Sequence, residues 1–238
     1  DSDEESYPDG QPPKNLLKTV FRSEIVVEVS GKWFYTEDLK KLFDVLVELK
    51  YKVVAPVKDK DRIILKSVKS FEEIELNYVR TVNNPKHFLM PLEETLFNWD
   101  LTNELKVEEK VLSDKIAFFG IHSCDANAIQ ILDLVMLEDP VDPYYLARRK
   151  DSLIITLDCL ESDEYCFCES VNSREPRIYD LRLTRFESGF AVKAGSQVGT
   201  RILEKIKVEK TVEPTFEERI NERIVNFNGL EKYYDSEK

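Results

Sequence analysis

Two short apolar runs constrain the fold more than any other feature of this sequence. Lys115–Gly120 reads Lys-Ile-Ala-Phe-Phe-Gly, and Asp151–Leu157 reads Asp-Ser-Leu-Ile-Ile-Thr-Leu. Runs of this length and composition are typical of strands that are buried on both faces of a parallel sheet. The chain is therefore expected to contain a sheet with helices packed on both sides.

A helical pattern follows the first run and ends before Pro140. Ser123 or Asp125 is the predicted N-cap, because both side chains can accept hydrogen bonds from first-turn amides. Its predicted apolar face consists of Ile129, Leu132, Val135 and Met136. A strand–turn–helix unit places its turn at the carboxyl edge of the sheet, where α/β proteins usually carry their sites. The sequence thus predicts an α/β protein with a mixed or parallel sheet, helices packed on it, and a functional loop at that edge.

The remaining elements follow from local patterns along the chain. Strands are predicted at Ser23–Ser30, Tyr51–Pro56 and Arg62–Lys66, a strand or loop at Val107–Leu112, and a hairpin from Ile178–Phe186 and Gly189–Lys193. Helices are predicted from Thr36 as N-cap, as a short or 3₁₀ segment within Pro91–Trp99, and at Val198–Ile206. The expected organisation is a flexible acidic tail (1–22), an α/β domain (23–210) with a sub-boundary near 110 left open, and a charged C-terminal helix or tail (211–238).

Charge and composition exclude several classes of protein. The net charge of −12 argues against binding to nucleic acid or anionic lipid, which needs a basic surface. The sequence predicts no membrane span and, because it opens on the acidic run Asp1–Glu5, no signal peptide. A cytoplasmic protein is therefore expected. Few Met and Gln residues beside abundant Lys, Glu and Ile are typical of hyperthermophiles.

Four cysteines lie close to the predicted carboxyl edge. Cys124 and Cys159 each follow one apolar run, and Cys166 and Cys168 lie in the polar loop after Cys159. If the two strands are neighbours, all four sulfurs converge there. Soft thiolates suit iron–sulfur clusters and zinc alike, and the spacing matches neither a ferredoxin nor a zinc ribbon. Cys124 and Cys159 could also be small buried hydrophobic residues, but a Cys-x-Cys in a polar loop is not a core pattern.

Several segments together resemble a known family. They are Asn84-Pro85-Lys86 with Pro91-Leu92-Glu93-Glu94-Thr95-Leu96-Phe97, Gly120–Ile129 with Leu132-Asp133, Asp142-Pro143-Tyr144-Tyr145 with Arg148-Arg149, and Cys159 with Cys166-Phe167-Cys168-Glu169-Ser170. In this combination the chain resembles, from about residue 36 to 205, the iron–sulfur β subunit of sulfhydrogenase-type nickel–iron hydrogenases and the A subunit of anaerobic sulfite reductase.

The resemblance implies a specific role. It implies one [4Fe–4S] cluster held by Cys124, Cys159, Cys166 and Cys168, with Phe167 and other apolar neighbours limiting water. It also implies an electron relay between a flavin-containing, NAD(P)H-linked subunit and a catalytic subunit of a hydrogenase- or reductase-type complex. Such a chain does no substrate chemistry itself, and the flavin belongs to the partner.

Two departures from the family pattern bear on this reading. His122-Ser123 stands where the family has Arg-Pro, and His122 is either a ligand or a hydrogen-bonding residue. The C-terminal ferredoxin-like domain of typical members has no counterpart here, so further clusters are expected on another chain, such as a separate ferredoxin-like subunit.

Three other functions remain open from the sequence. The same four ligands suit a zinc- or cluster-stabilised structural or assembly subunit without a redox role. A cluster-free descendant would serve only as a structural adaptor. A thiol oxidoreductase would use Cys166 and Cys168 as a reversible disulfide pair.

Overall fold

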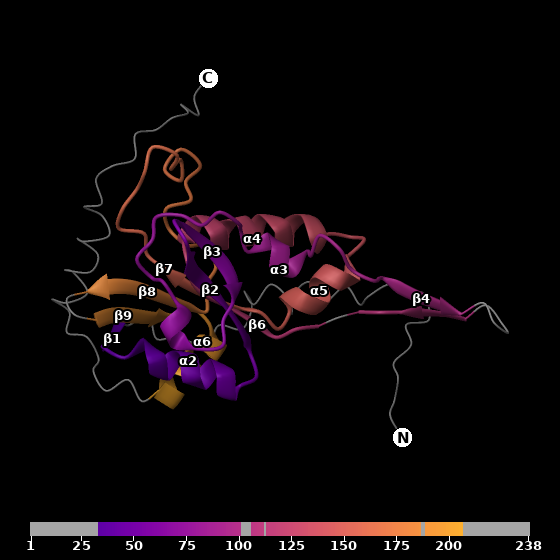
Figure 1. Ribbon diagram of the computed structural model, residues 1–238, viewed down its shortest axis with the longest axis horizontal. Coiled ribbons are helices and arrows are strands. Elements are labelled where there is room, and N and C mark those ends of the chain that lie inside the picture. Colours follow the sequence, from indigo (N-terminus) through magenta and orange to yellow (C-terminus); the bar gives the residue numbers. More distant parts are fainter. Residues whose placement is uncertain (1–32, 101–105, 112, 187–188, 207–238) are drawn as a thin grey trace.

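The computed structural model describes residues 33–100, 106–111, 113–186 and 189–206. Their main feature is a seven-stranded sheet in the order β1-β9-β8-β7-β6-β2-β3 (Figure 1). Its strands are β1 (Trp33–Thr36), β2 (Lys52–Asp59), β3 (Arg62–Ser67), β6 (Ile116–Ile121), β7 (Leu153–Leu157), β8 (Leu181–Phe186) and β9 (Gly189–Ala194). The four central strands β2, β6, β7 and β8 are parallel, and β1, β3 and β9 pair antiparallel with their neighbours. The predicted α/β fold is confirmed, and its sheet is mixed.

The two apolar runs form neighbouring parallel strands at the centre of this sheet. Every residue of β6 and β7 is buried, and Phe118 lies opposite Ile154. Such strands are buried because helices cover both faces of the sheet. Their carboxyl ends therefore meet at one edge, as the sequence predicts.

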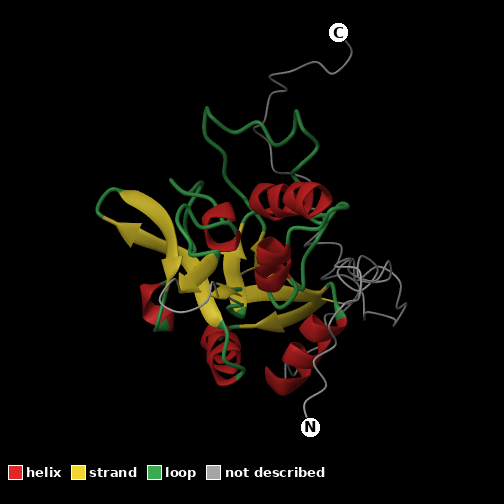
Figure 2. Cartoon of the chain, turned by 90° about the vertical axis from the view of Figure 1, so that its right-hand side faces the viewer, coloured by secondary structure: helices red, strands yellow, loops and turns green. Residues whose placement is uncertain are grey.

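Helices lie on both faces of the sheet (Figures 1 and 2). One face packs against α2 (Leu39–Glu48) and α6 (Gln197–Ile206), and the other packs against α3 (Lys86–Leu89), α4 (Ser123–Met136) and α5 (Pro143–Arg149). A short 3₁₀ turn, η1 (Phe71–Glu73), lies beside α2. No helix in the described ranges is long and apolar enough to span a bilayer.

Local capping differs from the prediction in α2. The sequence favours Thr36 as N-cap, but Asp38 occupies that position, and its carboxylate accepts a hydrogen bond from the Lys40 amide at 3.0 Å. Thr36 is instead the last residue of β1 and pairs with Phe190. Pairing with a strand more than 150 residues away decides this boundary, and no local pattern reports it.

The segment Pro91–Trp99 is not helical, so that prediction is wrong. Its end forms β4 (Phe97–Asp100), which pairs antiparallel with β5 (Lys106–Glu109), the strand left open as Val107–Leu112. This two-stranded hairpin projects from the body of the molecule (Figure 1). Phe97 and Trp99 are exposed on it. Phe97 and Trp99 are two residues apart and therefore lie on the same side of the strand.

Some predictions lie outside the described residues. These are the acidic tail 1–22, the strand Ser23–Ser30 and the C-terminal helix or tail 211–238. They remain predictions, as do the domain limits 23–210 and the sub-boundary near 110.

Candidate metal centre

The four cysteines are positioned by the carboxyl ends of β6 and β7. Cys124 is the second residue of α4, and Cys159 lies two residues after β7. Cys166 and Cys168 lie in the turns that connect β7 to β8. All four are free thiols. Their positions along the chain agree with the predicted loop at the carboxyl edge of the sheet, and the convergence of all four sulfurs stays a prediction.

The four thiols influence one another's pKa values. The pKa of Cys124 is raised in part by Cys159 and Cys168. The pKa of Cys159 is raised in part by Cys166 and Cys168, and the pKa of Cys166 in part by Cys168. Such effects require the groups to be near one another. Among the described residues, however, no three His, Cys, Asp or Glu side chains are close enough together to hold a metal ion. The cysteines share a neighbourhood without forming a closed coordination site.

The environment keeps these thiols protonated in the absence of a cation. Partial loss of water around the Cys124 thiol, helped by Asp125 and the other thiols, raises its pKa to about 12, although the residue as a whole is exposed at the surface. Burial is likewise the largest cause that raises the pKa of Cys159 to about 11, and it raises the pKa of Cys166 and Cys168. Four thiolates together would repel one another. A bound cationic centre would have to displace their protons, as thiolate ligation of metals requires.

The beginning of α4 carries unused hydrogen-bonding capacity. His122, not Ser123 or Asp125, is the N-cap, and it makes no side-chain capping bond among the described residues. The buried Ser123 hydroxyl, Oγ, has no hydrogen-bond partner in the part of the chain that is described. Free amides at a helix start favour negative charge. Four thiols beside these donors fit an anionic, thiolate-ligated group such as an iron–sulfur cluster.

His122 has a structural position rather than a free ring. Its Nδ1 lies 2.9 Å from the Leu157 carbonyl oxygen and its Nε2 lies 3.2 Å from that of Tyr78. The ring also stacks on Tyr78, with the ring centroids 4.2 Å apart. Both nitrogens face backbone oxygens, so the imidazole is not presented as a ligand. It joins the end of β7, before Cys159, to the turn before Cys124.

Gly120 makes the turn from β6 into α4. Its φ is +73°, and the β6–β7 register shifts between Phe119 and Ile121, which marks a bulge. The Tyr78 hydroxyl donates to the Gly120 carbonyl oxygen at 2.7 Å. A Cβ atom on Gly120 would lie 2.7 Å from a Leu76 methyl group. The bulge aims the chain toward the helix that carries Cys124.

Gly120→Ala is expected to lower the free energy of unfolding by about 1–2 kcal/mol from the left-handed backbone alone. Contact with Leu76 adds to that cost. Denaturant unfolding of Gly120→Ala and of the double variant with Leu76→Ala separates the two parts. Equal stability of wild type and Gly120→Ala would contradict the strain argument.

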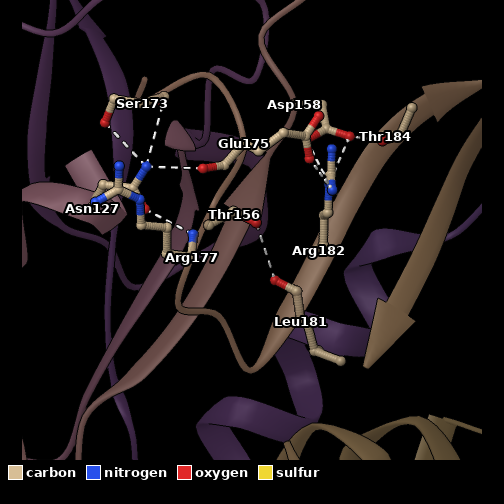
Figure 3. Close-up of polar contacts among 9 residues, drawn as sticks. All are labelled: Asn127, Thr156, Asp158, Ser173, Glu175, Arg177, Leu181, Arg182 and Thr184. Carbon is tan, nitrogen blue, oxygen red and sulfur yellow. Dashed lines mark hydrogen bonds and ion pairs between the residues drawn. The ribbon is translucent and has the colours of Figure 1, made fainter. Parts of the chain in front are cut away.

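Asn127 ties the cysteine loop to α4, one turn after Cys124 (Figure 3). Its buried Nδ2 group donates to the Ser173 carbonyl oxygen and hydroxyl at 3.3 and 3.0 Å, and to the Glu175 carbonyl oxygen at 2.9 Å. Its Oδ1 accepts from the Arg177 amide at 2.8 Å. One side chain thus fixes the far end of the loop. The sequence analysis missed this residue, although its place in the Cys-Asp-Ala-Asn motif was a signal.

Asp158 fixes the other end of the loop, directly before Cys159 (Figure 3). Its buried carboxylate accepts two hydrogen bonds from Arg182 Nε, at 2.8 and 3.1 Å, and one from the Thr184 hydroxyl. Arg182 also pairs with Glu175 at 2.6 Å. Burial raises the pKa of Asp158, and Arg182 opposes that rise. The loop is therefore held to β8 where it leaves the sheet.

Other residues of the motifs have structural partners. Arg148 pairs with Glu94, Arg149 pairs with Asp133, and Tyr145 is buried. Phe167 is 56% exposed, so the expectation that it shields the cysteines from water is wrong for this arrangement of the loop.

No family model matches the chain. A search of curated proteins finds 34% identity over 166 residues to Sulfhydrogenase 2 subunit beta of Pyrococcus furiosus, covering 69% of this chain and 48% of that protein. The chain thus spans about half the length of the relative. The matched part of the chain belongs to the sulfhydrogenase beta-subunit family, as its motifs predict.

Proposed function

We propose that this chain is an electron-transfer subunit that holds one [4Fe–4S] cluster on Cys124, Cys159, Cys166 and Cys168. The observation that carries the proposal is that four free cysteines follow β6 and β7 at the carboxyl edge of the sheet, where the N-cap of α4, His122, makes no side-chain capping bond among the described residues. Membership of the sulfhydrogenase beta-subunit family supports it.

A bound cluster would supply reversible one-electron transfer. The chain's own residues contribute position and polarity. The start of α4 would contribute the Cys124 thiol and hydrogen-bond donors to the cluster. The contacts of Asn127 and Asp158 hold the loop that carries Cys166 and Cys168. Donors near cluster sulfurs and the polarity around them tune the reduction potential.

The proposal extends to partners and setting. The chain would relay electrons between a flavin-containing, NAD(P)H-linked reductase subunit and a catalytic subunit of a hydrogenase- or reductase-type complex, with further clusters on a separate ferredoxin-like part. It would act in the cytoplasm. A thermophilic setting agrees with the composition and with the organism of the relative.

Cysteine replacement and metal analysis test the proposal. We expect anaerobically purified full-length chain to contain about four iron and four sulfide and to give an EPR signal after dithionite reduction. Cys166→Ser and Cys168→Ser should lose the iron and the signal, because each removes one thiolate. Val171→Ala, which changes an exposed residue of the same loop, should retain both.

Other outcomes assign other functions. One zinc per chain and no iron would indicate a structural or assembly subunit. A reversible Cys166–Cys168 disulfide without metal would indicate a thiol oxidoreductase. If the protein is metal-free, folds after both replacements and still supports a fully active complex, it is a structural adaptor without a cluster.

A further inference from the structure

The outward face of α4 is apolar and starts at Cys124. Ile131, Leu134 and Val135 are 59%, 57% and 65% exposed. Cys124, Ala128, Ile131 and Val135 recur at helical spacing and are all exposed. Single exposed apolar residues are ordinary, but a stripe along a helix that ends at a ligand candidate is not.

The cysteine loop adds exposed apolar side chains on the same side of the sheet. Phe167 and Val171 are 56% and 51% exposed. The loop rises beyond α4 on the side of the sheet that α4 covers (Figure 1). Asn127 joins the loop to α4. We call Ala128, Ile131, Leu134, Val135, Phe167 and Val171 together the α4 face.

Acidic groups outnumber basic ones beside the α4 face. The stretches 123–147 and 158–173 carry five carboxylates each and contain no Lys, Arg or His. Glu138, Asp139, Glu161 and Glu164 are exposed among them. The arginines nearest to these carboxylates are paired with them: Arg80 pairs with Asp163 at 2.7 Å and lies over the Tyr165 ring, and Arg174 pairs with Glu169 at 3.9 Å. The fringe is therefore negative.

We propose that the α4 face docks a protein electron carrier that has an apolar centre surrounded by lysines and arginines. The inference rests on the proposed electron-transfer function. Electrons pass efficiently only over short distances, and Cys124 is the exposed cysteine at the end of the stripe. The acidic fringe complements a basic rim and repels anionic lipid, nucleic acid and a second copy of this chain.

Mitochondrial cytochrome c, a small basic redox protein, serves as the probe, and its lysine-acetylated form is the matched control. The full-length, dithionite-reduced chain gives up one electron, and the ferric haem becomes ferrous, which absorbance follows. We expect reduction that slows as ionic strength rises and that is at least about tenfold slower with the acetylated probe.

Two pairs of variants locate the docking. Ile131→Gln should slow reduction about five- to tenfold, whereas Val47→Gln on α2 should not, although Val47 is also an exposed helical residue. Glu138→Lys should slow it about three- to tenfold at low salt, whereas Asp44→Lys on α2 should not. Both controls lie on the opposite face of the sheet (Figure 1).

Iron content and the visible spectrum of each variant distinguish failure of the proposed function from failure of the docking face. Absence of iron from the wild type overturns the proposed function. Intact iron with rates unchanged by Ile131→Gln and Glu138→Lys overturns the docking face alone. A dimer of the chain that Ile131→Gln dissociates in sedimentation would also overturn it, because the face would then belong to a second copy.

Discussion

Replacing Asp133 with alanine is expected to lower the free energy of unfolding by about 3–5 kcal/mol, as breaking one side of a buried ion pair does. Asp133 lies on the inner side of α4 and is 5% exposed. Its carboxylate accepts from Arg149 Nε at 2.8 and 3.1 Å and from an Arg149 terminal nitrogen at 2.9 Å. The Tyr145 hydroxyl donates to it at 2.7 Å.

The loss of stability in Asp133→Ala arises because Arg149 and Tyr145 remain largely buried without their acceptor. Arg149 and Tyr145 both belong to α5, so Asp133 is the polar junction between α4 and α5. Without it, a largely buried guanidinium and a buried phenol lose their acceptor. Replacing all the members with apolar groups of similar shape avoids that penalty. The triple variant Asp133→Leu, Arg149→Met, Tyr145→Phe should therefore be more stable than Asp133→Ala.

Denaturant unfolding of the full-length chain measures these differences. Asp44→Ala, which removes an exposed carboxylate from α2, is the control and should change stability by less than about 0.5 kcal/mol. A loss below about 1 kcal/mol for Asp133→Ala would show that the junction adds little. A triple variant less stable than Asp133→Ala would contradict this explanation. It would show that the loss of stability comes from the lost pairing itself and not from the buried charge left without a partner.

The sheet was predictable because its central strands have a distinctive sequence pattern. The runs that became β6 and β7 are continuously apolar, which only burial on both faces explains. Parallel neighbours must end at the same edge, so the positions of Cys124 and Cys159 followed from chain order alone. Helix α2 was also predictable, because Leu39, Leu42, Phe43 and Leu46 recur at helical spacing, and all four are buried.

The orientation of α4 was not predictable by the same means. Val135, predicted to face the core, is 65% exposed, and Asp133 is buried in its place. The helix has apolar residues on several sides, so spacing alone does not select the inner one. The inner side of α4 is set by Arg149, sixteen residues later in α5, because Arg149 forms a bidentate pair with Asp133. The cysteine loop was predicted as a loop, but its shape was not, because hydrogen bonds from Asn127 to backbone groups of the loop shape it.

Replacing Asn127 with alanine is the change that should most directly release the cysteine loop. The variant loses the three hydrogen bonds that Nδ2 donates and the one that Oδ1 accepts from the Arg177 amide. The backbone groups at Ser173, Glu175 and Arg177 that these part-buried bonds satisfy would then lack partners or bind water. We expect a loss of about 2–4 kcal/mol in stability and, in iron-loaded protein, faster release of iron to a chelator.

Asn83→Ala is a matched control for this prediction. Asn83 also bridges backbone groups, accepting from the Leu65 amide at 2.8 Å and donating to the Leu65 carbonyl oxygen at 2.9 Å, but it does so at β3. It should cost stability without changing iron release. Hydrogen exchange should show faster exchange of the Arg177 amide in Asn127→Ala only. If both variants release iron equally fast, global stability rather than the α4–loop contact governs retention, and the positioning role of Asn127 fails.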